Sequence, residues 1–137
     1  MPEPEPAPTT TVVRERTFDA APDEVWETLT DQVLLEQWLA SEVELDLREG
    51  GRARFAWEDG QTREAAIERV KPAQRLTWWW WAEGESPGRV DFRLEPAGEG
   101  TRVVVVETRP ASTVAGSPPW AAKLAMLGRL NARAVCV

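Results

Sequence analysis

Few side chains of this chain suit acid–base or nucleophilic chemistry. Its 137 residues include no His and no Tyr, and the single Cys is Cys136. Without an imidazole there is no Ser–His or Cys–His nucleophile pair and no imidazole ligand for a metal. A lone thiol cannot form an internal disulfide or a thiolate metal site. We therefore expect no metal, no cofactor and no catalytic residue of the usual kinds.

Two ionisable residues stand where a strand would place an apolar side chain. Glu107 continues the alternation of Val103 and Val105, and Arg16 precedes Phe18 at the same spacing. Because alternate side chains of a strand share a face, both charges are expected on the inner face of their strands. One interpretation is a structural ion pair, which we favour. The other is an active site in which Glu107 is a general base and Arg16 orients the substrate.

Four consecutive tryptophans, Trp78 to Trp81, are the most unusual feature of the chain. On a strand, Trp78 and Trp80 share one face, and Trp79 and Trp81 share the other. An inward pair either fills the core or forms an aromatic wall for a ligand. An outward pair exposes a large apolar area, which usually marks a protein interface, unless arginine and glutamate stems cover the rings.

The elements that position these residues follow from the hydrophobic period. Residues 1–10 alternate Pro with Glu and Ala, which predicts a disordered tail before a single domain over 11–137. Periods of two residues predict strands, and helical spacing predicts two short helices and a final long one. The expected strands are 12–18, 43–47, 53–57, 62–70, 76–82, 89–95 and 101–108, with helices beginning at Pro22, after Asp31 and near Trp120.

Charge and hydropathy exclude two classes of partner. The net charge is −7 and no basic cluster is present. Nucleic acids and anionic membranes both select clustered Lys and Arg, so we expect neither as a partner. No signal peptide opens the sequence and no apolar run approaches 18 residues, which predicts a cytoplasmic protein. The preference for arginine over lysine is typical of a high-GC bacterial genome.

Several short motifs occur in a particular order along the chain. They are Arg16–Trp26 (RTFDAAPDEVW), Leu29-Thr30-Asp31, Trp38, Asp46–Gly51 (DLREGG), Pro72, Arg75-Leu76, Trp80, Thr101–Val103 and Trp120. In this order, the chain resembles the SRPBCC (START-like) superfamily, in the branch of the activator of heat-shock-protein-90 ATPase homologues. The resemblance spans about residues 12–130.

The resemblance implies a helix-grip fold of the α+β class. In this fold a seven-stranded antiparallel sheet wraps around a long C-terminal helix, with two short helices between the first and second strands. An internal cavity lies between the sheet and the long helix. The implied function is a protein that encloses an apolar or aromatic small molecule, as a carrier, a sensor or a self-resistance protein.

The resemblance also orients the side chains. It turns Trp78 and Trp80 inward and makes the first and last strands neighbours, so Arg16 and Glu107 are expected to pair at one end of the cavity. Ala53 falls where relatives often have a large side chain, which leaves room. The expected cavity lining is Arg16, Trp38, Leu47, Ala53, Phe55, Trp57, Trp78, Trp80, Phe92, Val105, Glu107, Leu124 and Leu127.

Two other functions stay open. In one, the chain is an enzyme of the cyclase, dehydratase or hydrolase type that uses Glu107. In the other, it is a protein-interaction or chaperone-associated factor, or a homodimer. The interaction would use an outer surface formed by Trp79, Trp81, Val104 and Val106.

Overall fold

The computed structural model describes residues 9–110 and 118–131. Within these ranges the chain forms seven strands and three helices. The strands are β1 (Thr9–Phe18), β2 (Glu42–Leu45), β3 (Arg52–Ala56), β4 (Thr62–Lys71), β5 (Arg75–Trp81), β6 (Gly88–Ala97) and β7 (Gly100–Pro110), and the helices are α1 (Pro22–Thr30), α2 (Gln32–Trp38) and α3 (Trp120–Asn131).

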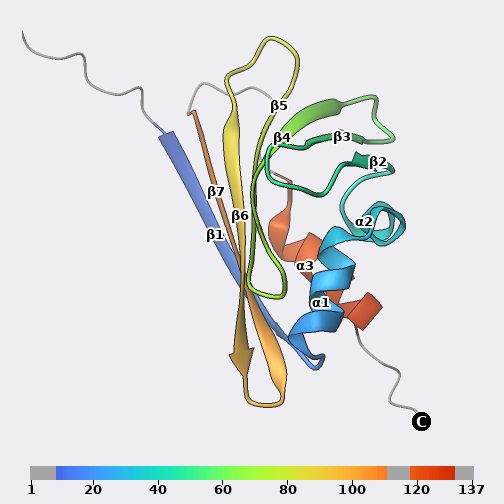
Figure 1. The fold of residues 1–137 in the computed structure, drawn as a ribbon. Coiled ribbons are helices and arrows are strands. Elements are labelled where there is room, and N and C mark those ends of the chain that lie inside the picture. The colour runs from blue at the N-terminus through green and yellow to red at the C-terminus, as the bar shows by residue number, and fades with distance from the viewer. Residues whose placement is uncertain (1–8, 111–117, 132–137) are drawn as a thin grey trace, which may run out of the picture.

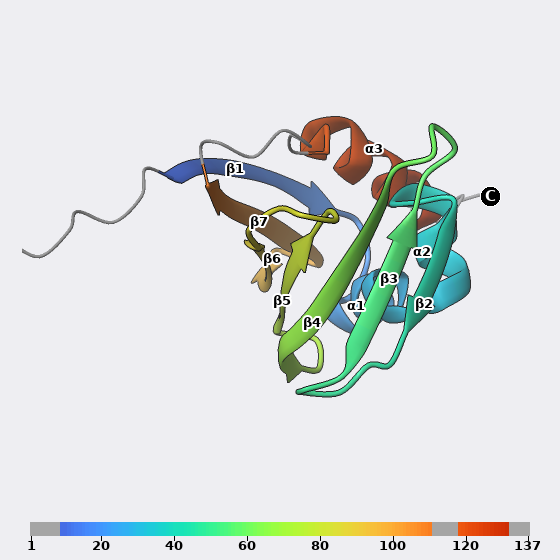
Figure 2. The ribbon, with the colours of Figure 1, turned by 90° about the horizontal axis from the view of Figure 1, so that it is seen from above.

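The strands form one antiparallel sheet in the order β1-β7-β6-β5-β4-β3-β2. The sheet curves around the helices, which all lie on its concave side (Figures 1 and 2). The long connection from β1 to β2 contains α1 and α2. The predicted helix-grip fold of the α+β class is therefore confirmed.

The strand boundaries differ from those expected by one to three residues, and two of these differences affect predictions made from the sequence. β1 begins at Thr9, so two residues of the expected N-terminal tail belong to a strand, and residues 1–8 lie outside the described ranges. β2 ends at Leu45, two residues before Leu47. Cys136 also lies outside the described residues.

Local sequence explains the two short helices. Pro22 occupies the first turn of α1 and is followed by Asp23 and Glu24, which suit the positive end of the helix dipole. Asp31 begins α2 as its N-cap, because its Oδ1 accepts a hydrogen bond from the Leu34 backbone N–H at 3.1 Å. This capping role was predicted from the sequence.

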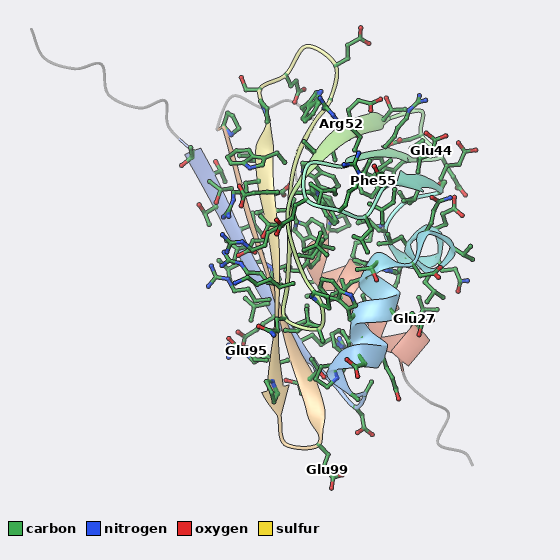
Figure 3. The ribbon with its side chains drawn as sticks, in the orientation of Figure 1. Glu27, Glu44, Arg52, Phe55, Glu95 and Glu99 are labelled. Atoms are coloured by element: carbon green, nitrogen blue, oxygen red, sulfur yellow. The ribbon has the colours of Figure 1, made fainter. Side chains whose placement is uncertain are left out.

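The core lies between the concave face of the sheet and the helices. Leu76, Trp78 and Trp80 of β5 are buried, whereas Trp79 is 38% exposed, so the predicted orientation of this strand is confirmed. Side chains fill the space between the two layers, and Phe55 points into it (Figure 3). Seven rings form what we call the aromatic cluster, with neighbouring ring centroids 5.1–6.3 Å apart: Trp38, Phe55, Trp57, Trp78, Trp80, Phe92 and Trp120.

The convex face of the sheet holds a charged group that is also buried. Asp91 Oδ1 accepts hydrogen bonds from Arg75 Nε at 2.8 Å and from the Thr77 hydroxyl at 2.7 Å. Its Oδ2 accepts from Arg75 Nη2 at 3.0 Å and from Arg93 Nε at 2.8 Å. Burial by itself would raise the pKa of Asp91, but these hydrogen bonds lower it to about 2.

Candidate functional site

A buried carboxylate lies at one end of the aromatic cluster. Glu107 of β7 is 1% exposed. Its Oε2 accepts a hydrogen bond from Trp80 Nε1 at 2.9 Å, and its Oε1 accepts one from Trp120 Nε1 at 3.2 Å. Trp80 comes from the centre of the sheet and Trp120 from the first residue of α3. The carboxylate therefore links the sheet to the helix that covers it.

Among the described residues, Arg63 supplies the positive charge closest to this carboxylate. Its Nη1 lies 3.9 Å from Glu107 Oε2, and the residue is 7% exposed. The guanidinium carbon lies 4.5 Å from the ring centroid of Trp80 and 5.8 Å from that of Trp57, within the range of cation–π attraction. Burial lowers the pKa of Arg63, and the negative charge of Glu107 opposes this effect. The pair is an ionic contact inside an aromatic environment.

A small cavity adjoins the ion pair. Its volume is about 10 Å³, which is room for about one water molecule. It lies between Arg63, Glu107 and the loop that joins β5 to β6. The interior next to the charges is therefore closely packed in this conformation.

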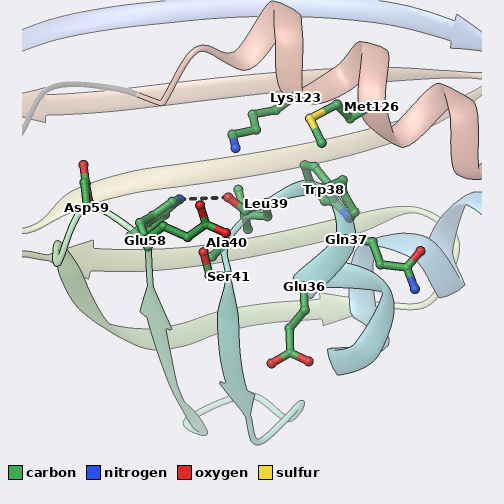
Figure 4. Close-up of a pocket in the computed structure, with 11 residues that line it drawn as sticks. Glu36, Gln37, Trp38, Leu39, Ala40, Ser41, Glu58, Asp59, Lys123 and Met126 are labelled. Carbon is green, nitrogen blue, oxygen red and sulfur yellow. Dashed lines mark hydrogen bonds between the residues drawn. The ribbon is translucent and has the colours of Figure 1, made fainter.

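A larger groove opens beside the aromatic cluster, between the α2–β2 connection, the β3–β4 turn and α3 (Figure 4). Its volume is about 530 Å³. Lys123 and Met126 of α3 form one wall, opposite Trp38 and Leu39 (Figure 4). Three carboxylates, those of Glu36, Glu58 and Asp59, also line the groove. Its size falls in the usual range for small-molecule sites.

Trp57 connects the groove to the interior. It lines the groove, and its ring centroid lies 6.3 Å from that of Phe55 and 6.0 Å from that of Trp80. Its indole Nε1 donates to the Leu39 carbonyl at 2.9 Å, which holds the ring in place. The groove is thus continuous with the aromatic cluster through Trp57.

The structure places most of the predicted lining residues in one region. Three of them are not fully buried: Trp57 is half-buried, and Leu47 and Arg16 are exposed. Leu47, 37% exposed, lies beyond the end of β2, so the strand alternation that placed it inward does not reach it. The buried members are Trp38, Ala53, Phe55, Trp78, Trp80, Phe92, Val105, Glu107, Leu124 and Leu127. Trp38 and Trp57 also line the groove.

The predicted pair between Arg16 and Glu107 is wrong. β1 and β7 are neighbours as expected, but their register places Arg16 opposite Val103 and Val12 opposite Glu107. Four residues of strand, about 14 Å, separate the two positions. Arg63 of β4 is the ionic partner instead, and the sequence analysis missed it. The sequence held a signal for the inward position of Arg63, because Arg63 alternates in phase with the apolar residues Ala65 and Ile67, which are both buried.

The contacts of Glu107 bear on the enzyme hypothesis. Both carboxylate oxygens already accept an indole N–H, and one of them also lies near Arg63. To take a proton from a substrate, Glu107 would have to break one of these contacts. The geometry is that of a fixed charge that positions its neighbours.

The outer tryptophans are partly covered by charged side chains. Trp79 Nε1 donates to Glu68 Oε1 at 2.8 Å, and Arg89 Nη2 bonds Glu68 Oε2 at 2.7 Å. Arg52 lies over the ring of Trp81, with its guanidinium carbon 5.8 Å from the centroid.

The other two residues of the expected outer surface, Val104 and Val106, lie on β7, which is separated from β5 by β6. Val104 and Val106 are half-buried, and on the neighbouring strand β6 they face Arg93 and Asp91. Charged groups therefore interrupt the apolar surface that was expected to be contiguous. An interface here stays a prediction.

Several solved structures are similar to this chain in architecture. Among solved structures, CalU16 from Micromonospora echinospora is 30% identical, with a TM-score of 0.72, and the match covers 90% of this chain and 76% of that one. DynU16, a protein of the dynemicin biosynthetic locus, is 24% identical with a TM-score of 0.76; the match covers 87% of this chain and 46% of DynU16. MLL2253 from Mesorhizobium loti is 23% identical with a TM-score of 0.75, over 88% of this chain and 96% of that one.

Other comparisons complete the assignment. Comparison with curated proteins finds no significant match. None of the helices in residues 9–110 and 118–131 has the length and apolar character that a membrane span requires. The sequence profile of one family matches residues 19–121. The chain belongs to the family described as activator of Hsp90 ATPase homolog 1-like protein.

Proposed function

We propose that this chain binds an apolar, aromatic small molecule between the sheet and α3. The groove is the mouth of the site, and the aromatic cluster is its inner wall. The observation that carries the proposal is the continuity through Trp57 of a groove of about 530 Å³ with a buried set of aromatic rings. Membership in the family supports a ligand-binding domain. A carrier or sensor role would follow from such binding.

The buried ion pair supports the same proposal. A buried ion pair usually adds little stability compared with apolar residues of similar volume. Arg63 and Glu107 are nevertheless inside the aromatic environment, and the Arg63 guanidinium carbon lies 5.8 Å from the ring centroid of Trp57, which lines the groove. In this proposal Glu107 of the pair holds the indoles of Trp80 and Trp120 in place, so that the inner wall is formed before a ligand binds.

The test is a binding screen of the purified chain against a panel of aromatic metabolites. Quenching of tryptophan fluorescence detects binding, and native mass spectrometry gives the stoichiometry. A compound that binds saturably at one per chain supports the proposal. If no compound of the panel binds, the proposal fails.

A pair of variants locates the site. Ser41 is exposed and lines the groove, so Ser41→Trp should obstruct it. Thr17 of β1 is exposed and does not line the groove, so Thr17→Trp is the matched control. We expect Ser41→Trp to weaken binding and Thr17→Trp to leave it unchanged. Equal affinities in the two variants would place the ligand elsewhere.

A further inference from the structure

One indole of the aromatic cluster has an unpaired N–H. Trp78 is 1% exposed, and its Nε1 has no hydrogen-bond acceptor among the described residues. Other indoles of the same region donate: Trp38 to the Thr28 carbonyl at 2.9 Å, Trp57 to the Leu39 carbonyl at 2.9 Å, Trp80 to Glu107 at 2.9 Å and Trp120 to Glu107 at 3.2 Å. Buried N–H groups are nearly always paired, so this exception needs an explanation.

The surroundings of Trp78 are aromatic. Its ring centroid lies 5.3 Å from that of Phe55, 5.6 Å from that of Trp80 and 5.1 Å from that of Phe92. On the sheet, Trp78 pairs with Ile67 on one side and with Val90 on the other. A donor left unpaired in such an environment is destabilising, and an acceptor placed beside it recovers that loss.

Trp78 is connected to the groove through two rings. Trp57 lines the groove, Phe55 is the next ring inward, and Trp78 follows Phe55. A flat molecule that enters between Trp57 and α3 and displaces Phe55 would therefore meet the Trp78 indole. Aromatic rings of the cluster would pack against its faces and edges.

We propose that Trp78 selects the chemical class of the ligand: a neutral, planar aromatic molecule that carries a hydrogen-bond acceptor such as a carbonyl oxygen. This inference rests on the proposed function. An indole N–H only donates, so the ligand must supply the acceptor. The ligand is neutral because the guanidinium of Arg63 lies over Trp80 and Trp57, not over Trp78, and is paired with Glu107. The nearby Glu107 carboxylate disfavours an anion.

The test uses two tricyclic compounds of nearly the same shape, 9-fluorenone and fluorene, of which only fluorenone has a carbonyl. Their dissociation constants are measured for the wild type, for Trp78→Phe and for Trp79→Phe. Trp78→Phe removes the unpaired N–H. Trp79→Phe is the matched control, since it removes an indole N–H that lies on the outer face of the sheet and is already bonded to Glu68.

We expect fluorenone to bind the wild type about tenfold more tightly than fluorene, which is the effect of one recovered hydrogen bond. This ratio should fall to about one in Trp78→Phe and persist in Trp79→Phe. In the wild type, the indole ¹H–¹⁵N signal of Trp78 should move downfield with fluorenone and much less with fluorene. This shift is measured in the wild type, so it does not depend on the stability of a variant. A variant is needed only to assign the Trp78 signal.

The outcomes separate the inference from the proposed function. Equal affinities of the two compounds for the wild type would overturn the inference and leave the proposed function standing. A ratio that persists in Trp78→Phe would also overturn it. If neither compound binds, the inference fails, and if the whole aromatic panel fails as well, the proposed function fails with it.

Discussion

The indole of Trp120 donates a hydrogen bond to the buried carboxylate of Glu107, with 3.2 Å between Nε1 and Oε1. The same indole stacks on Trp80, with ring centroids 6.0 Å apart and an angle of 20° between the planes. Since Trp120 is the first residue of α3, one side chain provides both an apolar and a polar attachment of this helix to the sheet.

Two substitutions of Trp120 separate these attachments. Trp120→Ala should lower the free energy of unfolding by about 3–5 kcal/mol, because it removes a large buried ring. Trp120→Phe keeps a ring but leaves Glu107 Oε1 without its donor, and should cost about 1–3 kcal/mol. Urea denaturation followed by circular dichroism gives both values. An unchanged midpoint for Trp120→Ala would show that α3 does not pack through this residue.

The contact between Arg63 and Glu107 predicts a strong coupling. Arg63→Met alone should cost about 3–5 kcal/mol, since it leaves a buried charge unpaired. Glu107→Gln should then be much less costly in the Arg63→Met background than in the wild type. The exposed pair Arg54–Glu64, with 3.6 Å between Nε and Oε1, is the control, and its coupling should be about 0–1 kcal/mol. A coupling at the buried pair no larger than at the exposed one would contradict this account.

The two faces of β5 should respond differently to substitution. Trp78→Ala or Trp80→Ala opens a void in the core and should cost about 3–5 kcal/mol. Trp79→Ser combined with Trp81→Thr should cost about 1 kcal/mol, because these rings are partly exposed. Thermal unfolding of the three variants checks the order. A larger loss for the outer pair would mean that the strand faces the opposite way.

The same outer variant tests the interface hypothesis. If Trp79 and Trp81 join two copies of the chain, the wild type sediments as a dimer and the outer variant as a monomer. A wild type that is monomeric at high concentration would remove this hypothesis.

Asp91 predicts a dependence of stability on acid. Its pKa is about 2 in the folded chain, against an ordinary value of 3.8. A depressed pKa contributes stability that is complete above about pH 4 and is lost as the pH falls toward 2. At about 1.36 kcal/mol per pH unit, the contribution is on the order of 2 kcal/mol. Asp91→Asn should therefore be less stable than the wild type at pH 7, and the difference should shrink between pH 4 and pH 2.

Asp46→Asn is the control for this measurement. Asp46 is exposed and pairs with Arg48 two residues along the chain. Its substitution should change the stability little at any of these pH values. A difference for Asp91→Asn that stays constant down to pH 2 would show that its hydrogen bonds do not favour the ionised form.

Local patterns predicted much of this fold. The alternation along residues 76–81 identified which tryptophans are buried, because each strand side chain points opposite to the one before it. The cap at Asp31 was also predictable, because the interaction joins two residues only three positions apart in the sequence.

Long-range relations could not be predicted in the same way. The register of β1 against β7 decides that Val12, not Arg16, lies opposite Glu107, and no local pattern encodes it. The register of β4 against β5 shifts between Ile67 and Arg69, so Glu68 has no residue opposite it on β5. The Glu68 side chain bonds Trp79 instead. The groove depends on how α3 lies beside the β3–β4 turn, which is a tertiary relation. The site was therefore only partly predictable.

The central claim is that an aromatic molecule binds between the sheet and α3, and indole NMR tests it most directly. The eight tryptophans give eight possible reporters. With ¹⁵N-labelled protein and the tightest compound of the panel, we predict saturable shifts of the Trp57 and Trp38 indole signals, which report on the groove, together with an unmoved Trp79 signal from the outer face of the sheet. Shifts confined to Trp79, or no shift of Trp57 and Trp38 at saturation, would contradict the account.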